Sequence, residues 1–154
     1  QRYAPGISPQ THPRLDALVG YALAYFRDFV KPATHYRPAD ETERAAFIAL
    51  DAALVALSAD ASAEAVQDTA LDVARAIPRY QNLTAKNATP ERPGVSGDWW
   101  KAIYQVMFGE DQGPRFGSFA AIYGLPNTHA LIAKALAGDL VKEHAAFLAT
   151  RKAD

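Results

Sequence analysis

Hydrophobic residues recur at helical spacing near the start of the chain and predict a first helix there. The stripe consists of Leu15, Leu18, Val19, Ala22, Phe26 and Phe29. Pro13 stands just before this stripe, where the first turn of a helix accepts a proline. Pro32 follows it, and a proline cannot continue a helix. We therefore expect one helix between these two prolines.

Two more helices are expected next, each with a polar residue at its start. Asp40 and Glu43 are three residues apart, as in a capping box, and precede the second apolar stripe. A third stripe follows Ser62 and stops at Pro78. The two stripes are Phe47, Leu50, Leu54 and Leu57, and Val66, Ala70, Val73 and Ile77. Alanine, which has the highest helix propensity, is abundant in both segments and strengthens both predictions.

The helical pattern is interrupted between residues 79 and 97, where prolines, glycines and asparagines replace the apolar periodicity. We expect a loop-rich connection in that segment. Four helices are expected beyond it: one from Trp100 to Phe108 that ends at Gly109, Pro114–Tyr123 closed by Gly124, one capped by Asn127 or Thr128, and one after Gly138 and Asp139.

The pattern as a whole predicts an all-α fold, a single bundle or cage of about seven helices. A chain of 154 residues is long enough for one domain with a sizeable core. We expect residues 1–13 to be the tail of a preceding segment and residues 14–154 to form the helical domain. Because the chain opens on Gln1 rather than on Met, we also expect it to be a fragment of a longer protein.

Composition and charge reduce the number of functions that this chain is expected to have. The chain has no cysteine, and its four histidines lack the spacing of a metal-binding pair, so we expect no metal site. The net charge is −1, although residues 1–78 hold 7 Lys and Arg against 10 Asp and Glu, and residues 79–154 hold 9 against 7. This asymmetry directs the search for an anion site to the second half.

The sequence shows no segment typical of a membrane protein, a secreted protein or a common enzyme. No apolar run approaches the roughly 20 residues of a membrane span, and no leader resembles a signal peptide. We therefore expect a cytoplasmic protein without a membrane partner. The phosphate-binding and nucleophile motifs of common enzymes are also missing from the sequence, so we expect no catalytic residue in this chain.

The segment GPRFGSFAAIYG, residues 113–124, combines a helix start with an unusual cation. Pro114 suits the first helical position, which places Arg115, Phe116 and Gly117 in the first turn. The amides of a first turn lack partners within the helix and bind phosphates readily. A cation beside these amides is favourable where an anion bridges both, so the segment permits a phosphate site.

The same segment also has a purely structural interpretation. A glycine inside a helix costs about 1 kcal/mol relative to alanine, so Gly117 can be present because two helices cross closely there. Arg115 can pair with Glu110 or Asp111. The sequence leaves both interpretations open.

Two adjacent tryptophans precede this segment. Trp99 and Trp100 cannot share one face of a helix, and Lys101 follows them. We expect Trp100 to lie in the core. Trp99 and Lys101 are candidates for an RNA contact, because unstacked bases stack on aromatic rings beside cations.

These residues resemble the C-terminal end of class I lysyl-tRNA synthetases. The most specific block is WWKAIYQVMFGEDQGPRFGSFAAIYGLPNTHALIAKAL, residues 99–136. A second block, RLDALVGYALAYFRDFVKPATHYRP at 14–38, is similar to the helix at the entrance of the same domain, and PGVSGDWW at 93–100 matches the approach to the aromatic helix. The segment 79–92 fits least well.

The resemblance implies a helical anticodon-binding domain of the class I synthetase type, with tRNA-Lys as its partner. The parent enzyme would join lysine to tRNA-Lys with ATP and Mg²⁺ on an N-terminal catalytic domain, which is the second partner. The present chain contains neither signature motif of that domain, so we expect it to be inactive alone and to need no cofactor. The candidate tRNA-binding residues, inferred from their chemistry and not fixed by the resemblance, are Arg115, Trp99, Lys101, Phe116 and Gly117.

Three alternatives stay open at this point. The chain could be a helical protein-interaction module without RNA binding, which its near-neutral charge and alanine-rich helices support. It could be the related domain of a glutamyl-tRNA synthetase. A stand-alone enzyme is the third alternative, and the absence of a convergent catalytic set argues against it.

Overall fold

The computed structural model describes residues 6–151, which are mostly helical, with seven α-helices and one minimal two-stranded sheet. This confirms the all-α prediction. The chain divides between Thr34 and His35 into two units. The functional boundary that we expected at residues 13 and 14 stays a prediction.

The first unit contains helix α1, Pro13–Tyr25, as the first apolar stripe predicts. The helix begins at the expected proline. Its α-helical hydrogen bonding ends earlier than the stripe does, because Phe26–Val30 forms a π-helical turn and Lys31–Ala33 a 3₁₀ turn. Pro32 has no N–H to donate, so the α-helical ladder cannot continue through this segment.

The second unit begins with two helices whose starts were predicted correctly. In α2, Glu41–Val55, the Asp40 carboxylate accepts a hydrogen bond from the Glu43 backbone N–H, and the Glu43 carboxylate accepts one from the Asp40 N–H. Both distances are 2.9 Å, so the capping box is complete. In α3, Ala63–Arg75, the Ser62 hydroxyl caps the helix by accepting from Ala65 N–H at 3.1 Å.

The expected loop-rich connection contains a short turn and a small hairpin. A 3₁₀ turn, Pro78–Tyr80, leads into strand β1, Gln81–Asn82, which pairs antiparallel with β2, Gly94–Val95. The Tyr80 carbonyl then accepts a hydrogen bond from Ser96 N–H at 2.7 Å. This contact fixes the residue that caps the following helix, α4, Gly97–Met107.

The last three helices are α5, Phe116–Tyr123, α6, Leu125–Ala137, and α7, Asp139–Arg151. Two predicted starts are wrong. Pro114 lies outside α5, because Arg115, with ψ of 125°, is the N-cap residue and the first turn begins only at Phe116. Helix α6 begins before Asn127 or Thr128, because Gly124 adopts a φ of 93° that lets the chain turn directly into a proline-containing first turn.

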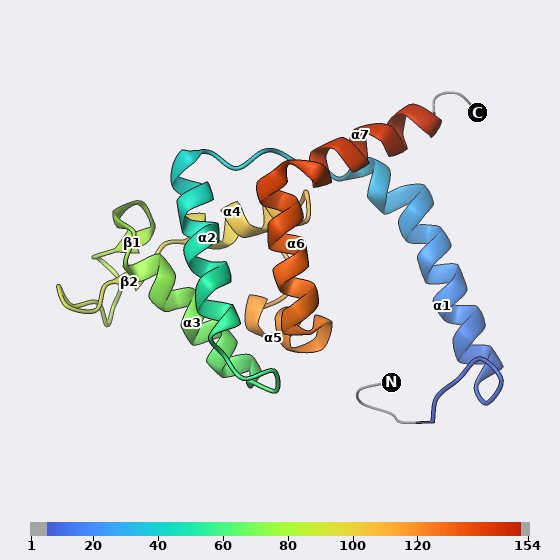
Figure 1. The fold of residues 1–154 in the computed structure, drawn as a ribbon, viewed down its shortest axis with the longest axis horizontal. Coiled ribbons are helices and arrows are strands. Elements are labelled where there is room, and N and C mark those ends of the chain that lie inside the picture. The colour runs from blue at the N-terminus through green and yellow to red at the C-terminus, as the bar shows by residue number, and fades with distance from the viewer. Residues whose placement is uncertain (1–5, 152–154) are drawn as a thin grey trace. The chain divides into compact units, whose positions relative to one another are not determined.

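The core of the second unit lies among helices α2 to α6. Figure 1 shows α2 with α3 on one side and α6 on the other, and α5 packs against both α3 and α6. Trp99 lies at the centre of an aromatic cluster, with its ring 5.0 Å from that of Tyr80 and 6.0 Å from that of Phe47. The cluster joins α4 to α2 and to the turn before the hairpin.

Candidate nucleic-acid interface

A pocket of about 330 Å³ lies between α4, the loop that joins α4 to α5, and one side chain of α3. Its wall includes Gln67, Trp100, Lys101, Tyr104, Gly113 and Arg115. Three of the six therefore come from α4, two from the following loop, and one from a residue far away in the sequence. The pocket combines aromatic surface, two cations and fixed polar groups.

Lys101 and Arg115 are the two cations at this pocket. Both side chains are exposed, and neither makes a hydrogen bond or ion pair with any residue that the structure describes. The structural alternative in which Arg115 pairs with Glu110 or Asp111 is therefore not observed. The Asp111 carboxylate also lines the pocket, but it accepts from Gln105 and forms no ion pair with either cation. An anion that enters the pocket would therefore meet two cations that are not ion-paired, and one carboxylate.

The two tryptophans of α4 exchange their expected roles. Trp99 is 0% exposed and belongs to the core, so it offers no surface to a ligand in this fold. Trp100 is only partly buried and lines the pocket. The sequence signal was ambiguous because the buried face of α4 is wide, with Ala102, Ile103, Tyr104, Val106 and Met107 all buried.

Phe116 and Gly117 are both buried, and Gly117 is where α5 crosses α3. A Cβ added to Gly117 would overlap the carbonyl oxygen of Ala63 and lie 2.8 Å from Gln67 Cβ. The Gly117 N–H donates a hydrogen bond to Gln67 Oε1 at 2.8 Å. The close-crossing interpretation of Gly117 is therefore confirmed, and its amide is not free to hold a phosphate.

Gln67 is a residue that sequence reasoning missed. It lies inside the apolar stripe of α3, next to Val66, and is 7% exposed. A glutamine at a core-facing position must satisfy its amide group, and that requirement was the available signal. Half of the group is satisfied by Gly117, and its NH₂ has no partner among the described residues.

Tyr104 forms the floor of the pocket beneath the loop. A Cβ added to Gly113 would overlap its ring and lie 2.7 Å from Cδ1, so the loop can pass over the ring only because residue 113 lacks a side chain. Tyr104 is 6% exposed, and its buried hydroxyl has no hydrogen-bond partner among the described residues. Burial raises the pKa of this hydroxyl above its ordinary value, so it stays protonated.

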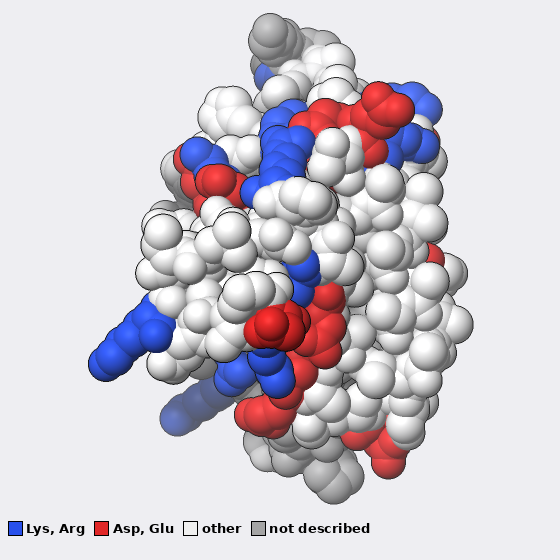
Figure 2. Space-filling view, turned by 90° about the vertical axis from the view of Figure 1, so that its left-hand side faces the viewer, with Lys and Arg blue, Asp and Glu red and all other residues white. Residues whose placement is uncertain are grey.

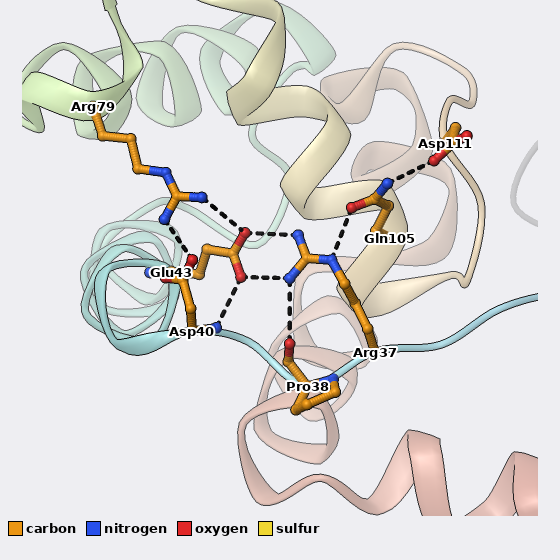
Figure 3. A network of polar contacts seen from close by, with 7 residues as sticks. All are labelled: Arg37, Pro38, Asp40, Glu43, Arg79, Gln105 and Asp111. Atoms are coloured by element: carbon orange, nitrogen blue, oxygen red, sulfur yellow. Dashed lines mark hydrogen bonds and ion pairs between the residues drawn. The ribbon is translucent and has the colours of Figure 1, made fainter.

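A polar network holds the loop that joins α4 to α5 at Asp111 (Figure 3). Arg37 donates two hydrogen bonds to the Glu43 carboxylate, at 2.6 and 2.7 Å, and its Nε donates to Gln105 Oε1 at 2.8 Å. Gln105 Nε2 in turn donates to Asp111 Oδ1 at 2.6 Å. The loop is thus connected through α4 to the capping box of α2.

Glu43 is the central charge of this network, and its side chain is only 1% exposed. Burial alone would raise the pKa of Glu43, but the hydrogen bonds from Arg37 and from the Asp40 backbone outweigh it and hold the pKa below the ordinary value. Arg79 adds a further positive charge, with Nη2 at 3.8 Å from Glu43 Oε1. The carboxylate is therefore fully ionised at neutral pH.

The surface charge is mixed. On the face that carries the β1–β2 hairpin, Lys and Arg are interspersed with Asp and Glu between broad uncharged areas (Figure 2). Within the described residues, no helix combines the length and the apolar character that a membrane crossing needs. Among these described residues, no three His, Cys, Asp or Glu side chains form a group that could hold a metal ion. The pocket with its two unpaired cations is the site that the sequence prediction and the structure share.

Comparison with known proteins finds relatives that are much longer than this chain. It is 39% identical to the lysine–tRNA ligase of Roseobacter denitrificans, over 93% of the chain and 24% of that protein. It is 31% identical to the lysine–tRNA ligase of Rickettsia bellii over 88% of the chain and 23% of that protein, and 30% identical to that of Rickettsia felis over 85% and 22%. The chain spans about a quarter of the length of these relatives and is homologous to that part of them. No protein-family model and no solved structure matches the chain.

Proposed function

We propose that this chain is the anticodon-recognising, tRNA-binding C-terminal part of a class I lysine–tRNA ligase. The observation that carries the proposal is the 39% identity to a lysine–tRNA ligase over 93% of the chain. The lysine ligases among its relatives favour tRNA-Lys over the glutamyl alternative. Aminoacylation with ATP and Mg²⁺ would belong to an N-terminal catalytic domain of the same cytoplasmic enzyme, and this chain alone would be inactive.

The pocket supports a role in RNA binding. Lys101 and Arg115 supply two charges that are free to meet phosphates, and Trp100 supplies an accessible ring beside them. Single-stranded RNA is commonly held by this combination of cations and stacking surfaces. Trp99, Phe116 and Gly117 would then contribute by shaping the pocket from inside the core.

The test is a titration of the 154-residue chain with the anticodon stem-loop of tRNA-Lys, followed by fluorescence anisotropy at several salt concentrations. Each phosphate contact contributes about 0.7 to 0.9 to the slope of log affinity against log salt concentration. We expect Arg115→Ala and Lys101→Ala each to weaken binding and to reduce this slope by roughly one contact. Neither side chain has a described partner, so the melting temperature should stay unchanged.

The matched controls are Arg92→Ala and Lys86→Ala, which remove exposed cations from the segment between β1 and β2. Neither residue lines the pocket, so both variants should retain the affinity and the salt slope of the wild type. If all four variants lose affinity equally, the binding is non-specific and the proposed interface is wrong. If the wild-type chain does not bind the stem-loop at any salt concentration, the RNA-binding role of this chain is wrong.

A protein-interaction role is the second candidate, and an apolar pocket favours it. That pocket, of about 360 Å³, is lined by residues that include Leu54, Val55, Leu57, Leu125 and Pro126. Val55 is 65% exposed beside it. A mostly apolar interface would keep its affinity as salt rises, whereas phosphate contacts lose theirs, so the same titration separates the two functions.

A further inference from the structure

Resting on the proposed function, we infer that the pocket between α3, α4 and the α4–α5 loop holds one unstacked RNA base, and that Gln67 and Tyr104 are the residues that read its edge. The inference goes beyond phosphate binding by Lys101 and Arg115, because it assigns base specificity to two buried side chains. The base that fits best presents a carbonyl oxygen, as uracil does.

Gln67 provides a hydrogen-bond donor whose orientation is fixed. Its Oε1 accepts from the Gly117 N–H at 2.8 Å, so the NH₂ must occupy the other end of the amide. Gln67 is only 7% exposed and lines the pocket, and its NH₂ has no partner among the described residues. A donor held in one orientation at the wall of a pocket is available to an acceptor on a ligand, and a base carbonyl is such an acceptor.

Tyr104 provides a second polar group in the same wall. Its hydroxyl is buried without a described partner, a situation that proteins generally avoid. Two other buried groups share this situation, the Tyr80 hydroxyl and the Trp99 indole N–H, but both belong to the aromatic core cluster and neither lines the pocket. Tyr104 differs from them because it is the one whose residue lines the pocket.

The rest of the pocket suits a single base. Its volume of about 330 Å³ lies at the lower end of the range for small-ligand pockets. Trp100 lines it with an aromatic ring, on which any base can stack. Stacking is tolerant of sequence, so discrimination between bases has to come from hydrogen-bonding groups, which here are the Gln67 amide and the Tyr104 hydroxyl.

The test compares two stem-loops, that of tRNA-Lys and a copy with its anticodon bases replaced by adenosine, which has no carbonyl oxygen. The measured quantity is the ratio of the two affinities. We expect Tyr104→Phe and Gln67→Glu each to reduce this ratio roughly tenfold, the effect of about one lost hydrogen bond. Gln67→Glu keeps an acceptor for the Gly117 N–H while it removes the donor, and Tyr104→Phe keeps the ring beneath Gly113. The salt slope of both variants should stay that of the wild type, because no phosphate contact is changed.

Tyr80→Phe is the matched control, since it removes a buried hydroxyl without a described partner from a residue outside the pocket. It should leave the affinity ratio unchanged. Retention of the full ratio in Tyr104→Phe and in folded Gln67→Glu would overturn the inference and leave salt-dependent RNA binding intact. A wild-type chain that binds both stem-loops equally would also overturn it. A wild-type chain that binds neither would overturn the proposed function and this inference together.

Discussion

Replacement of Gly117 by alanine tests whether the crossing of α3 and α5 is as close as the structure shows. The added Cβ would overlap the Ala63 carbonyl oxygen and lie 2.8 Å from Gln67 Cβ and 2.9 Å from Gln67 N. Two of these three atoms belong to the backbone of α3, so a change of rotamer cannot relieve the overlap. The two helices must move apart.

Three effects set the size of the expected loss. Overpacking of this kind costs about 1–3 kcal/mol. Separation of the helices also breaks the buried hydrogen bond from Gly117 N–H to Gln67 Oε1, which adds about 1–3 kcal/mol. The higher helix propensity of alanine returns about 1 kcal/mol. We therefore expect Gly117→Ala to lower the free energy of unfolding by about 3 kcal/mol, which corresponds to a fall in Tm of roughly 6–12 °C for a chain of this size.

The assay is urea unfolding followed by circular dichroism, with Gly97→Ala as the control. Gly97 stands at the first position of α4, and nothing lies within 4 Å of a Cβ added there. The control should be neutral or slightly stabilised, because it gains helix propensity without a clash. If Gly117→Ala is as stable as Gly97→Ala, the helices are not in close contact and the orientation argued for Gln67 is wrong as well.

Three further changes test the network, the tryptophans and a helix cap. Glu43→Gln should lower stability at neutral pH by about 1–3 kcal/mol, because it removes a charged partner of Arg37. The pKa of Glu43 is depressed in the folded state, so its contribution to stability is present above the ordinary value of 4.5 and is lost as the pH falls through the folded pKa. The variant should therefore lose less stability than the wild type on acidification. Urea titrations from pH 7 to 3 measure this difference. Trp99→Ala should lower the free energy of unfolding by about 3–5 kcal/mol without changing RNA affinity per folded molecule. Trp100→Ala should weaken RNA binding by roughly 1–3 kcal/mol, the contribution of one stacked base. Thermal melts measure the first effect and anisotropy the second. Ser62→Ala should cost about 1 kcal/mol by removing the α3 cap, and an unchanged urea midpoint would contradict the capping contact.

Local chemistry was sufficient to predict most of the helices. Asp40 and Ser62 cap α2 and α3 because a side-chain oxygen satisfies the orphan amides of a first turn, which is a short-range effect visible in sequence. The start of α5 was misplaced because Arg115 takes a non-helical ψ where the chain meets α3, which is a tertiary effect. The π-helical turn after α1 was likewise not visible in the apolar spacing.

The candidate site was predictable only in part, for the same reason. Lys101 and Arg115 could be proposed from sequence, and the structure brings them to one pocket. The assignment of Trp99 and Trp100 could not be settled by periodicity, because residues on both sides of the α4 stripe are buried and only the contact with Tyr80 and Phe47 selects Trp99 for the core. Gln67 meets Gly117 across fifty residues, a pairing that no local pattern encodes.

The contact between α3 and α5 therefore connects the stability of the domain to the chemistry of its pocket. The absence of a side chain at Gly117 lets the two helices approach closely, and its N–H orients the amide of Gln67, which lines the pocket. Changes at either residue should alter stability and base preference together. Lys101 and Arg115 are different, since no described residue depends on their charge, and they can be altered without a cost to the fold. If the chain binds RNA as proposed, we expect the electrostatic contribution to binding to be separable from folding, and base reading to depend on the packing of the core.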